Sequence, residues 1–85
     1  MPSAEFPEPN FEALRLRLSM LRHERNWTYD ALAEHSGVSR RSLVALETGD
    51  KVRPSNGSVE TWYRLAKAFG IPIGDLLGAL NDDSK

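Results

Sequence analysis

The chain has 85 residues, which allows one small domain and no second core. Hydrophobic residues make up 40% of it and charged residues 27%, as in ordinary soluble domains, and the absence of cysteine excludes disulfides and thiolate metal sites and favours a reducing cytoplasm. The net charge of −1, taken alone, argues against a nucleic-acid partner.

Charge is unevenly distributed along the chain. The segment from Arg15 to Arg53 carries eight cations and five acids, a net charge of +3, whereas the remainder carries three cations and seven acids, a net charge of −4. Salt screens each charge within ~10 Å, so the local sign matters more than the total for a nucleic-acid-binding surface. A mixed, solvated surface would explain the same pattern.

The first ten residues are expected to form an extended arm, because residues 1–9 contain three prolines and no helical pattern. They contain neither the basic start nor the apolar run of a signal peptide. No stretch of the chain approaches membrane-spanning length. We therefore expect a cytoplasmic protein that does not contact a membrane.

A helix is predicted from about Phe11 to about His23, with Asn10 as its N-cap. Its inward stripe consists of Phe11, Leu14, Leu18 and Leu21. A second apolar patch on the far side consists of Ala13, Leu16 and Met20. Burial of this patch under the arm through Phe6 is the preferred explanation, and a subunit contact is the alternative.

Two short helices are predicted to meet at Gly37. The first begins after the capping residue Thr28 and ends at Gly37, which can adopt the left-handed conformation that a tight turn needs. Ser39 caps the second helix, which extends to Thr48. This arrangement is a helix-turn-helix.

The second of these helices has two distinct faces when residues are placed ~100° apart. One arc of about 140° holds Arg40, Arg41, Val44, Ala45 and Thr48. The other side holds Ser42, Leu43, Leu46 and Glu47. Cations in the first turn oppose the helix dipole by some tenths of a kcal/mol, so we expect the outward face to contact a partner.

A loop, DKVRPSNGS, follows Gly49, and Ser58 then caps a helix that Gly70 ends. The inward positions of that helix are Trp62, Leu65, Ala66 and Phe69. A last short helix is predicted over about Gly74 to Leu80, and residues 81–85 form a frayed acidic tail. Since no segment alternates with period two, the predicted fold class is an all-α, five-helix bundle.

No catalytic or cofactor site is predicted. His23 and His35 each neighbour a glutamate, but adjacent helical residues point about 100° apart, so solvated histidines are expected. The chain has no glycine-rich phosphate loop, no nucleophile in a recognisable context and no clustered metal ligands. We expect no enzyme activity, cofactor, metal or small-molecule effector.

Five ordered motifs cover roughly residues 11 to 80: L-x-x-L-R at 18–22, W-T-x-x-x-L-A at 27–33, G-V-S at 37–39, S-L-x-x-L-E-x-G at 42–49 and R-L-A-K-A-F-G-I-P at 64–72. In this set the chain resembles the Xre/Cro-like phage-repressor family of helix-turn-helix DNA-binding transcriptional regulators. The resemblance implies a lambda-repressor-like domain over residues 11–80. The Ser55 to Ser58 region departs from the family as a small insertion.

The resemblance also implies roles for individual residues. Expected base-reading residues are Arg40, Arg41, Val44, Ala45 and Thr48. Expected phosphate contacts are Thr28, Tyr29, Ser39, Lys51 and Arg53. Tyr29 is expected to point outward from the first turn of its helix, and the alternative to a phosphate contact is an exposed tyrosine that lies on Leu or Arg side chains. Arg22 and Glu47, both at the margin of an inward face, match a position pair that forms a structural ion pair in the family.

Two hypotheses of function follow. The first is a regulator, repressor-like, that binds double-stranded DNA as a homodimer on an inverted repeat, because one domain reads only ~4 to 6 base pairs. The dimer contact would use the last helix or the Leu16 and Met20 patch. The alternative is a protein-interaction module on the same scaffold, similar to an antitoxin, which the near-neutral charge and the apolar Val44 and Ala45 favour.

Overall fold

The structure is a computed structural model that describes residues 8–49 and 56–82. Its elements are α1 (Phe11–Glu24), α2 (Tyr29–Ser36), α3 (Arg40–Thr48), α4 (Val59–Phe69), α5 (Ile73–Leu77) and the short 3₁₀ helix η1 (Gly78–Asn81). These residues contain no strand, so the prediction of an all-α, five-helix bundle is confirmed. None of the helices described is both long and apolar enough to cross a membrane.

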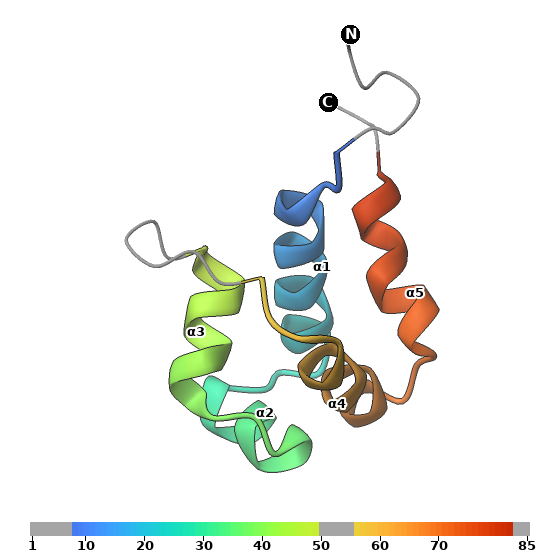
Figure 1. The fold of residues 1–85 in the computed structure, drawn as a ribbon. Coiled ribbons are helices and arrows are strands. Elements are labelled where there is room, and N and C mark those ends of the chain that lie inside the picture. Colours follow the sequence, from blue (N-terminus) through green and yellow to red (C-terminus); the bar gives the residue numbers. More distant parts are fainter. Residues whose placement is uncertain (1–7, 50–55, 83–85) are drawn as a thin grey trace, which may run out of the picture.

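Helix α1 runs between α3 on one side and α5 on the other, and α2 and α4 lie across one end of this layer (Figure 1). Its apolar stripe, with Leu14 and Leu18 fully buried, meets the inward faces of the other helices. The remaining buried apolar residues are Leu32, Val38, Leu43, Leu46, Trp62, Leu65, Ala66, Phe69 and Leu76. One core therefore holds all five helices.

Local capping interactions set the helix boundaries. The predicted N-caps accept hydrogen bonds from backbone N–H groups three residues on, and they are Asn10, Thr28, Ser39 and Ser58. Gly37 ends α2 with φ 76°, the left-handed conformation that the turn requires. Beside it, the Ser36 hydroxyl donates to Leu32 O at 2.7 Å and accepts from Val38 N at 3.1 Å, which fixes the corner between α2 and α3.

The last helix differs from the prediction. It begins at Ile73, directly after Pro72, and changes at Gly78 from α-helix to the tighter η1. Asn10 ties this end to the start of α1, because its backbone N–H donates to Leu80 O at 2.9 Å and its side-chain amide donates to Asp82 O at 2.8 Å. Glycine is a weak helix former, so these tertiary bonds decide the local geometry.

Arg22 of α1 and Glu47 of α3 form a two-point ion pair. Arg22 Nε lies 2.9 Å from Glu47 Oε2, and Arg22 Nη2 lies 2.8 Å from Glu47 Oε1. The two side chains are only 10% and 9% exposed. Arg22 Nη1 also donates to the carbonyl of Trp27 at 2.9 Å, so one guanidinium joins α1, the α1–α2 turn and α3.

Tyr29 completes this cluster, and the expectation that it points outward is wrong. Its hydroxyl donates to Glu47 Oε1 at 2.7 Å, and the Arg22 guanidinium lies 4.2 Å from the centre of its ring. The side chain is half-buried, between Arg22 of α1 and Glu47 of α3. A phosphate contact through this hydroxyl proton would require the bond to Glu47 to break.

The cluster shifts the pKa of each of its members. Burial alone would raise the pKa of Glu47, but hydrogen bonds from Arg22 and Tyr29 outweigh it and hold that pKa below its ordinary value. The hydrogen bond to Glu47 raises the pKa of Arg22. Burial, followed by the bond to Glu47, raises the pKa of Tyr29. All three shifts keep the ion pair charged and the phenol neutral at neutral pH.

Replacing Glu47 with alanine should lower the free energy of unfolding by about 3 kcal/mol, because it leaves the buried Arg22 charge without its partner. Chemical denaturation would measure this loss. Glu60→Ala is the matched control, since it breaks the Arg64–Glu60 pair, whose side chains are 50% and 72% exposed, and should cost at most about 0.5 kcal/mol. Equal losses in both variants would contradict the structural role given to Glu47.

The same carboxylate should make stability depend on pH. Since the pKa of Glu47 is lower in the folded than in the unfolded chain, its contribution is complete above the unfolded value of ~4.3 and is lost as pH falls through the folded pKa. Unfolding curves of the wild type and Glu47→Gln should differ most near neutral pH and converge in acid. A difference that stays constant below pH ~4 would contradict this linkage.

Candidate nucleic-acid interface

The outward face of α3 is a continuous, shallow surface. The five residues predicted to share one arc line a single hollow, and they are Arg40, Arg41, Val44, Ala45 and Thr48. Leu43 and Leu46, on the opposite face, are buried in the core. Ser42 departs from the predicted inner side, because it is exposed at the helix cap and its hydroxyl accepts from Ser39 Oγ at 3.0 Å.

The two arginines of this face differ in their surroundings. Arg40 Nε lies 3.3 Å from Asp30 Oδ1 on α2, and the two side chains are 65% and 82% exposed. An exposed pair of this kind contributes little stability, so Arg40 can exchange this partner for another anion at small cost. Arg41 is exposed and makes no hydrogen bond or ion pair with any other residue that the structure describes.

The middle and end of the face are apolar. Val44 and Ala45 are half-buried, so they present methyl groups at the floor of the hollow. The Thr48 hydroxyl donates to Val44 O at 2.7 Å, which uses its proton inside the helix. Thr48 therefore offers a methyl group and acceptor lone pairs to a ligand, and its donor is already engaged.

Two of the residues expected at phosphates lie at helix N-termini. The Thr28 hydroxyl accepts from Ala31 N at 3.0 Å and donates to no residue in the described part of the chain, so its proton is available. The Ser39 hydroxyl accepts from Ser42 N at 3.2 Å and donates to Ser42 Oγ. Lys51 and Arg53 lie outside the described residues.

Arg15 contacts the C-terminal end of α3, and the sequence analysis did not identify it as a residue that contacts this helix. A methyl group at Gly49 would lie 2.8 Å from Arg15 Nε, and Arg15 Nη2 donates to Asn56 Oδ1 at 3.2 Å. Arg15 thus lies against the C-terminal end of α3, a helix with no basic residue in its last turn. The signal available in the sequence was its seven-residue spacing from Arg22, which places both on one side of α1.

The loop end before α4 is also anchored. Trp62 Nε1 donates to Asn56 O at 2.6 Å, and Gly57, with φ 77°, has no room for a side chain, because an added methyl group would lie 2.8 Å from Trp62 Nε1. Asn56 and Gly57, which belong to the region that the sequence marked as an insertion, therefore lie against the buried Trp62.

The two histidines are exposed, but each has a neighbour. The His35 ring stacks on Trp27 with 4.3 Å between centroids, and His23 Nε2 lies 3.2 Å from Arg22 Nη2. Within the described ranges, no three histidine or acidic side chains lie close enough to hold a metal ion. Neither histidine borders the α3 hollow.

Comparison with known proteins gives consistent matches. An uncharacterized HTH-type transcriptional regulator of Methanocaldococcus jannaschii is 35% identical over 63 residues, which cover 74% of this chain and 89% of that protein. Another uncharacterized HTH-type transcriptional regulator, from Archaeoglobus fulgidus, is 33% identical over 63 residues, which cover 74% of this chain and 83% of that protein. No solved structure matches the chain.

The family comparison agrees with the geometry of α2 and α3. A family model described as a helix-turn-helix domain matches residues 13–80, which include every helix of the structure except the first two residues of α1 and the last residue of η1. The chain therefore belongs to the helix-turn-helix domain family.

Proposed function

We propose that the protein is a sequence-specific transcriptional regulator of the Xre/Cro-like group, which binds double-stranded DNA with α3 in the major groove. It acts as a repressor-like homodimer on an inverted-repeat operator. The observation that carries the proposal is the hollow face of α3, where two arginines stand at the N-terminal end of an otherwise apolar surface. The names of the archaeal relatives support a role in transcription.

The arginines supply the base contacts in this proposal. Residues in the first turn of a recognition helix enter the groove most deeply, and arginine pairs with both O6 and N7 of guanine. Arg41 is free to do so, and Arg40 first releases Asp30, 3.3 Å away. At least one guanine is therefore expected in each half-site.

The rest of the face supplies apolar contacts. Val44 and Ala45 expose methyl groups that suit the C5 methyl group of thymine. Thr48 can contact a base with its methyl group or accept a hydrogen bond from it, since its hydroxyl already donates to Val44 O. These residues favour an A·T pair beside the guanine.

Phosphate contacts hold the domain on the duplex. Thr28 and Ser39 lie at the N-termini of α2 and α3, where backbone N–H groups and the helix dipole attract anions. Lys51 and Arg53, in the following loop, are assigned to phosphates from the sequence. Tyr29 is left out of this set because its hydroxyl already donates a hydrogen bond to Glu47.

The alternative is a protein-interaction module, antitoxin-like, on the same scaffold. The half-buried Val44 and Ala45 and the net charge of −1 favour an apolar protein partner. The salt dependence of binding distinguishes the two functions, because phosphate neutralisation makes affinity fall steeply with salt concentration and an apolar interface does not.

If the protein binds DNA, Lys51→Ala should lower the slope of log K against log salt concentration by about one and weaken binding to all DNA sequences equally.

The principal prediction is that Arg40→Ala and Arg41→Ala each weaken binding to the specific operator by ~1 to 3 kcal/mol and relax preference at one base pair. The operator would first be selected from a random DNA pool. Titrations of specific and scrambled duplexes at two salt concentrations would then measure the loss, which should be larger on the specific duplex.

Lys67→Ala is the control for this experiment. It removes one exposed positive charge from α4, at a position that lies outside the hollow. Its affinity for both duplexes should stay close to that of the wild type. If both arginine variants lost affinity equally on the two duplexes, α3 would not be reading bases.

The proposed homodimer predicts the number of chains that bind one operator. Two chains should bind one operator whose half-sites lie ~10 base pairs apart, since one domain reads too few base pairs for useful specificity. Sedimentation of the protein with a duplex of one operator would measure the ratio. One chain per operator, with no second binding event at higher concentration, would refute the inverted-repeat arrangement.

A further inference from the structure

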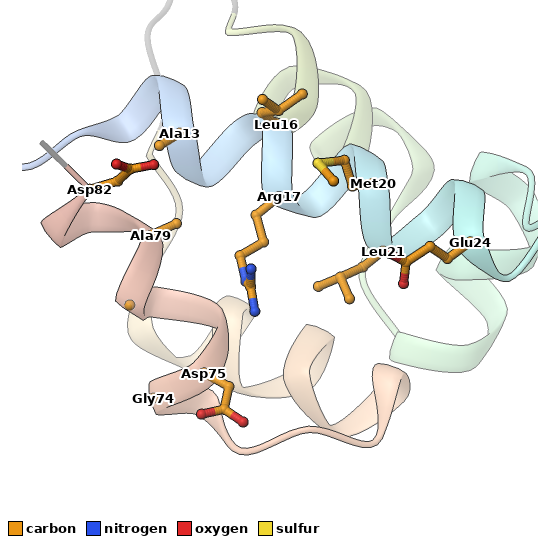
Figure 2. A pocket seen from close by; sticks show the side chains of 11 residues that line it. Ala13, Leu16, Arg17, Met20, Leu21, Glu24, Gly74, Asp75, Ala79 and Asp82 are labelled. Carbon is orange, nitrogen blue, oxygen red and sulfur yellow. The ribbon is translucent and has the colours of Figure 1, made fainter. Parts of the chain in front are cut away.

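A groove lies between α1 and the α5–η1 segment, with Arg17 extending into it from α1 and Asp75 on its opposite wall (Figure 2). Leu16 and Met20 line it and are 61% and 52% exposed, so no part of the described chain covers them. Phe6, which was expected to do so, lies outside the described residues. Both places expected for the dimer contact border this groove, so it is left to the proposed homodimer, and a further partner needs a different surface.

A separate surface lies between the C-terminal end of α2 and the exposed side of α4, and we call it the α2/α4 surface. Helix α2 contributes His35 to its lining, and α4 contributes Glu60, Tyr63, Arg64 and Lys67. The four α4 residues are spaced three or four positions apart or adjoin such a position, so one side of the helix presents them all. None of the lining residues belongs to the α3 hollow or to the groove.

The α4 side of this surface exposes apolar area. Tyr63 is 54% exposed, and Val59, one turn before it, is 74% exposed. Together with Leu16 and Met20 of the groove, they are the four large hydrophobic residues that are exposed in the described part of the chain. Exposed apolar residues that adjoin each other and are bordered by polar ones mark contact sites, and tyrosine is enriched at protein interfaces. The α2/α4 surface therefore has the apolar component of a protein-binding site.

The polar side chains of this surface offer hydrogen-bond donors. The Lys67 ammonium and the Tyr63 hydroxyl make no hydrogen bond or ion pair with any other residue that the structure describes. The His35 ring is held by stacking on Trp27, and its nitrogens have no hydrogen-bond partner within the described ranges. Each of these three side chains can donate a hydrogen bond to a ligand.

Arg64 is held in place by the one acid of the surface. Arg64 Nη2 lies 2.8 Å from Glu60 Oε2. Its Nη1 lies close to the turn between α2 and α3, because a methyl group at Gly37 would lie 3.3 Å from it. Since Glu60 is paired on its own helix, the charge of Lys67 is not neutralised, and the lining has two cations and one acid.

We propose that the α2/α4 surface binds an acidic segment of another protein, whose carboxylates meet Lys67 and Arg64 while a neighbouring apolar or aromatic side chain packs on Tyr63. Carboxylates are acceptors only, so they complement a surface that offers donors and an excess of positive charge. The proposal goes beyond the proposed function. Because the α2/α4 surface shares no lining residue with the α3 hollow, DNA and the acidic segment occupy different residues.

A nucleic acid fits this surface less well. Surfaces that bind nucleic acids are strongly positive, whereas here Glu60 offsets one of two cations. The exposed side chains of Val59 and Tyr63 also add apolar area that a phosphate backbone does not use. An acidic protein segment with an apolar residue matches both the charge and the apolar area.

The first experiment selects peptides from a displayed library of short random sequences on the immobilised full chain. Enriched peptides should carry several acids around an aromatic or large aliphatic residue, because both parts of the surface then find a partner. The same selection on Lys67→Glu should not enrich them. A selection that enriches no peptide, or only peptides without acids, would overturn the proposal.

Titrations of one enriched acidic peptide would then measure the contribution of each side chain. Tyr63→Ala and Lys67→Glu should each weaken binding about tenfold. Lys67→Arg is the matched control, because it keeps the positive charge at the same position, and its affinity should stay close to that of the wild type. All three changes are at exposed side chains, so the melting temperature should change little. Equal affinity of Lys67→Glu and Lys67→Arg would overturn the charge pairing.

Nuclear magnetic resonance would locate the bound peptide. The amide signals of α4 and of the end of α2 should shift during the titration, and those of α3 should not. Excess scrambled DNA duplex should leave the peptide bound. If the duplex displaced it and Lys67→Glu weakened DNA binding as much as Arg41→Ala does, the surface would belong to the DNA interface and the proposal would be overturned. If the peptide binds as expected but no DNA sequence is selected, the proposed function fails alone.

Discussion

The two-point contact between Arg22 and Glu47 holds α3 at a fixed angle and depth against α1. Both groups are almost fully removed from water, and both find further partners in the Trp27 carbonyl and the Tyr29 hydroxyl. Loss of one partner would leave a buried charge, so alternative placements of α3 on α1 carry a large energetic penalty. This penalty, together with the burial of Leu43 and Leu46 in the core, fixes the position of the outward face of α3.

The charged side chains of α3 oppose its helix dipole. It has no acid in its first turn, where Arg40 and Arg41 stand, and its last turn contains Glu47 and no cation. The compensation comes from α1, since Arg22 neutralises Glu47 and Arg15 lies against Gly49. The arginines at the other end therefore remain available on the surface, because the stability of α3 is supplied by a neighbouring helix.

Helix α1 also separates two surfaces of different chemistry. One side of it carries the arginines that hold α3, and another carries Leu16, Met20 and Arg17 beside α5. The α3 hollow contains cations and methyl groups, whereas the groove contains exposed apolar residues and more acids than cations. The two surfaces therefore differ in their balance of charge and favour partners of different chemistry.

The sequence by itself determined the first four helices, their caps and the five residues of the α3 face, because these depend on neighbours three or four positions away. It also predicted the Arg22–Glu47 pair through a resemblance. Tertiary structure alone decided that Tyr29 turns inward, that Arg40 meets Asp30 and that Arg15 lies on Gly49. These contacts join different helices, and helical periodicity specifies which face a side chain occupies but not which neighbour the fold brings to it.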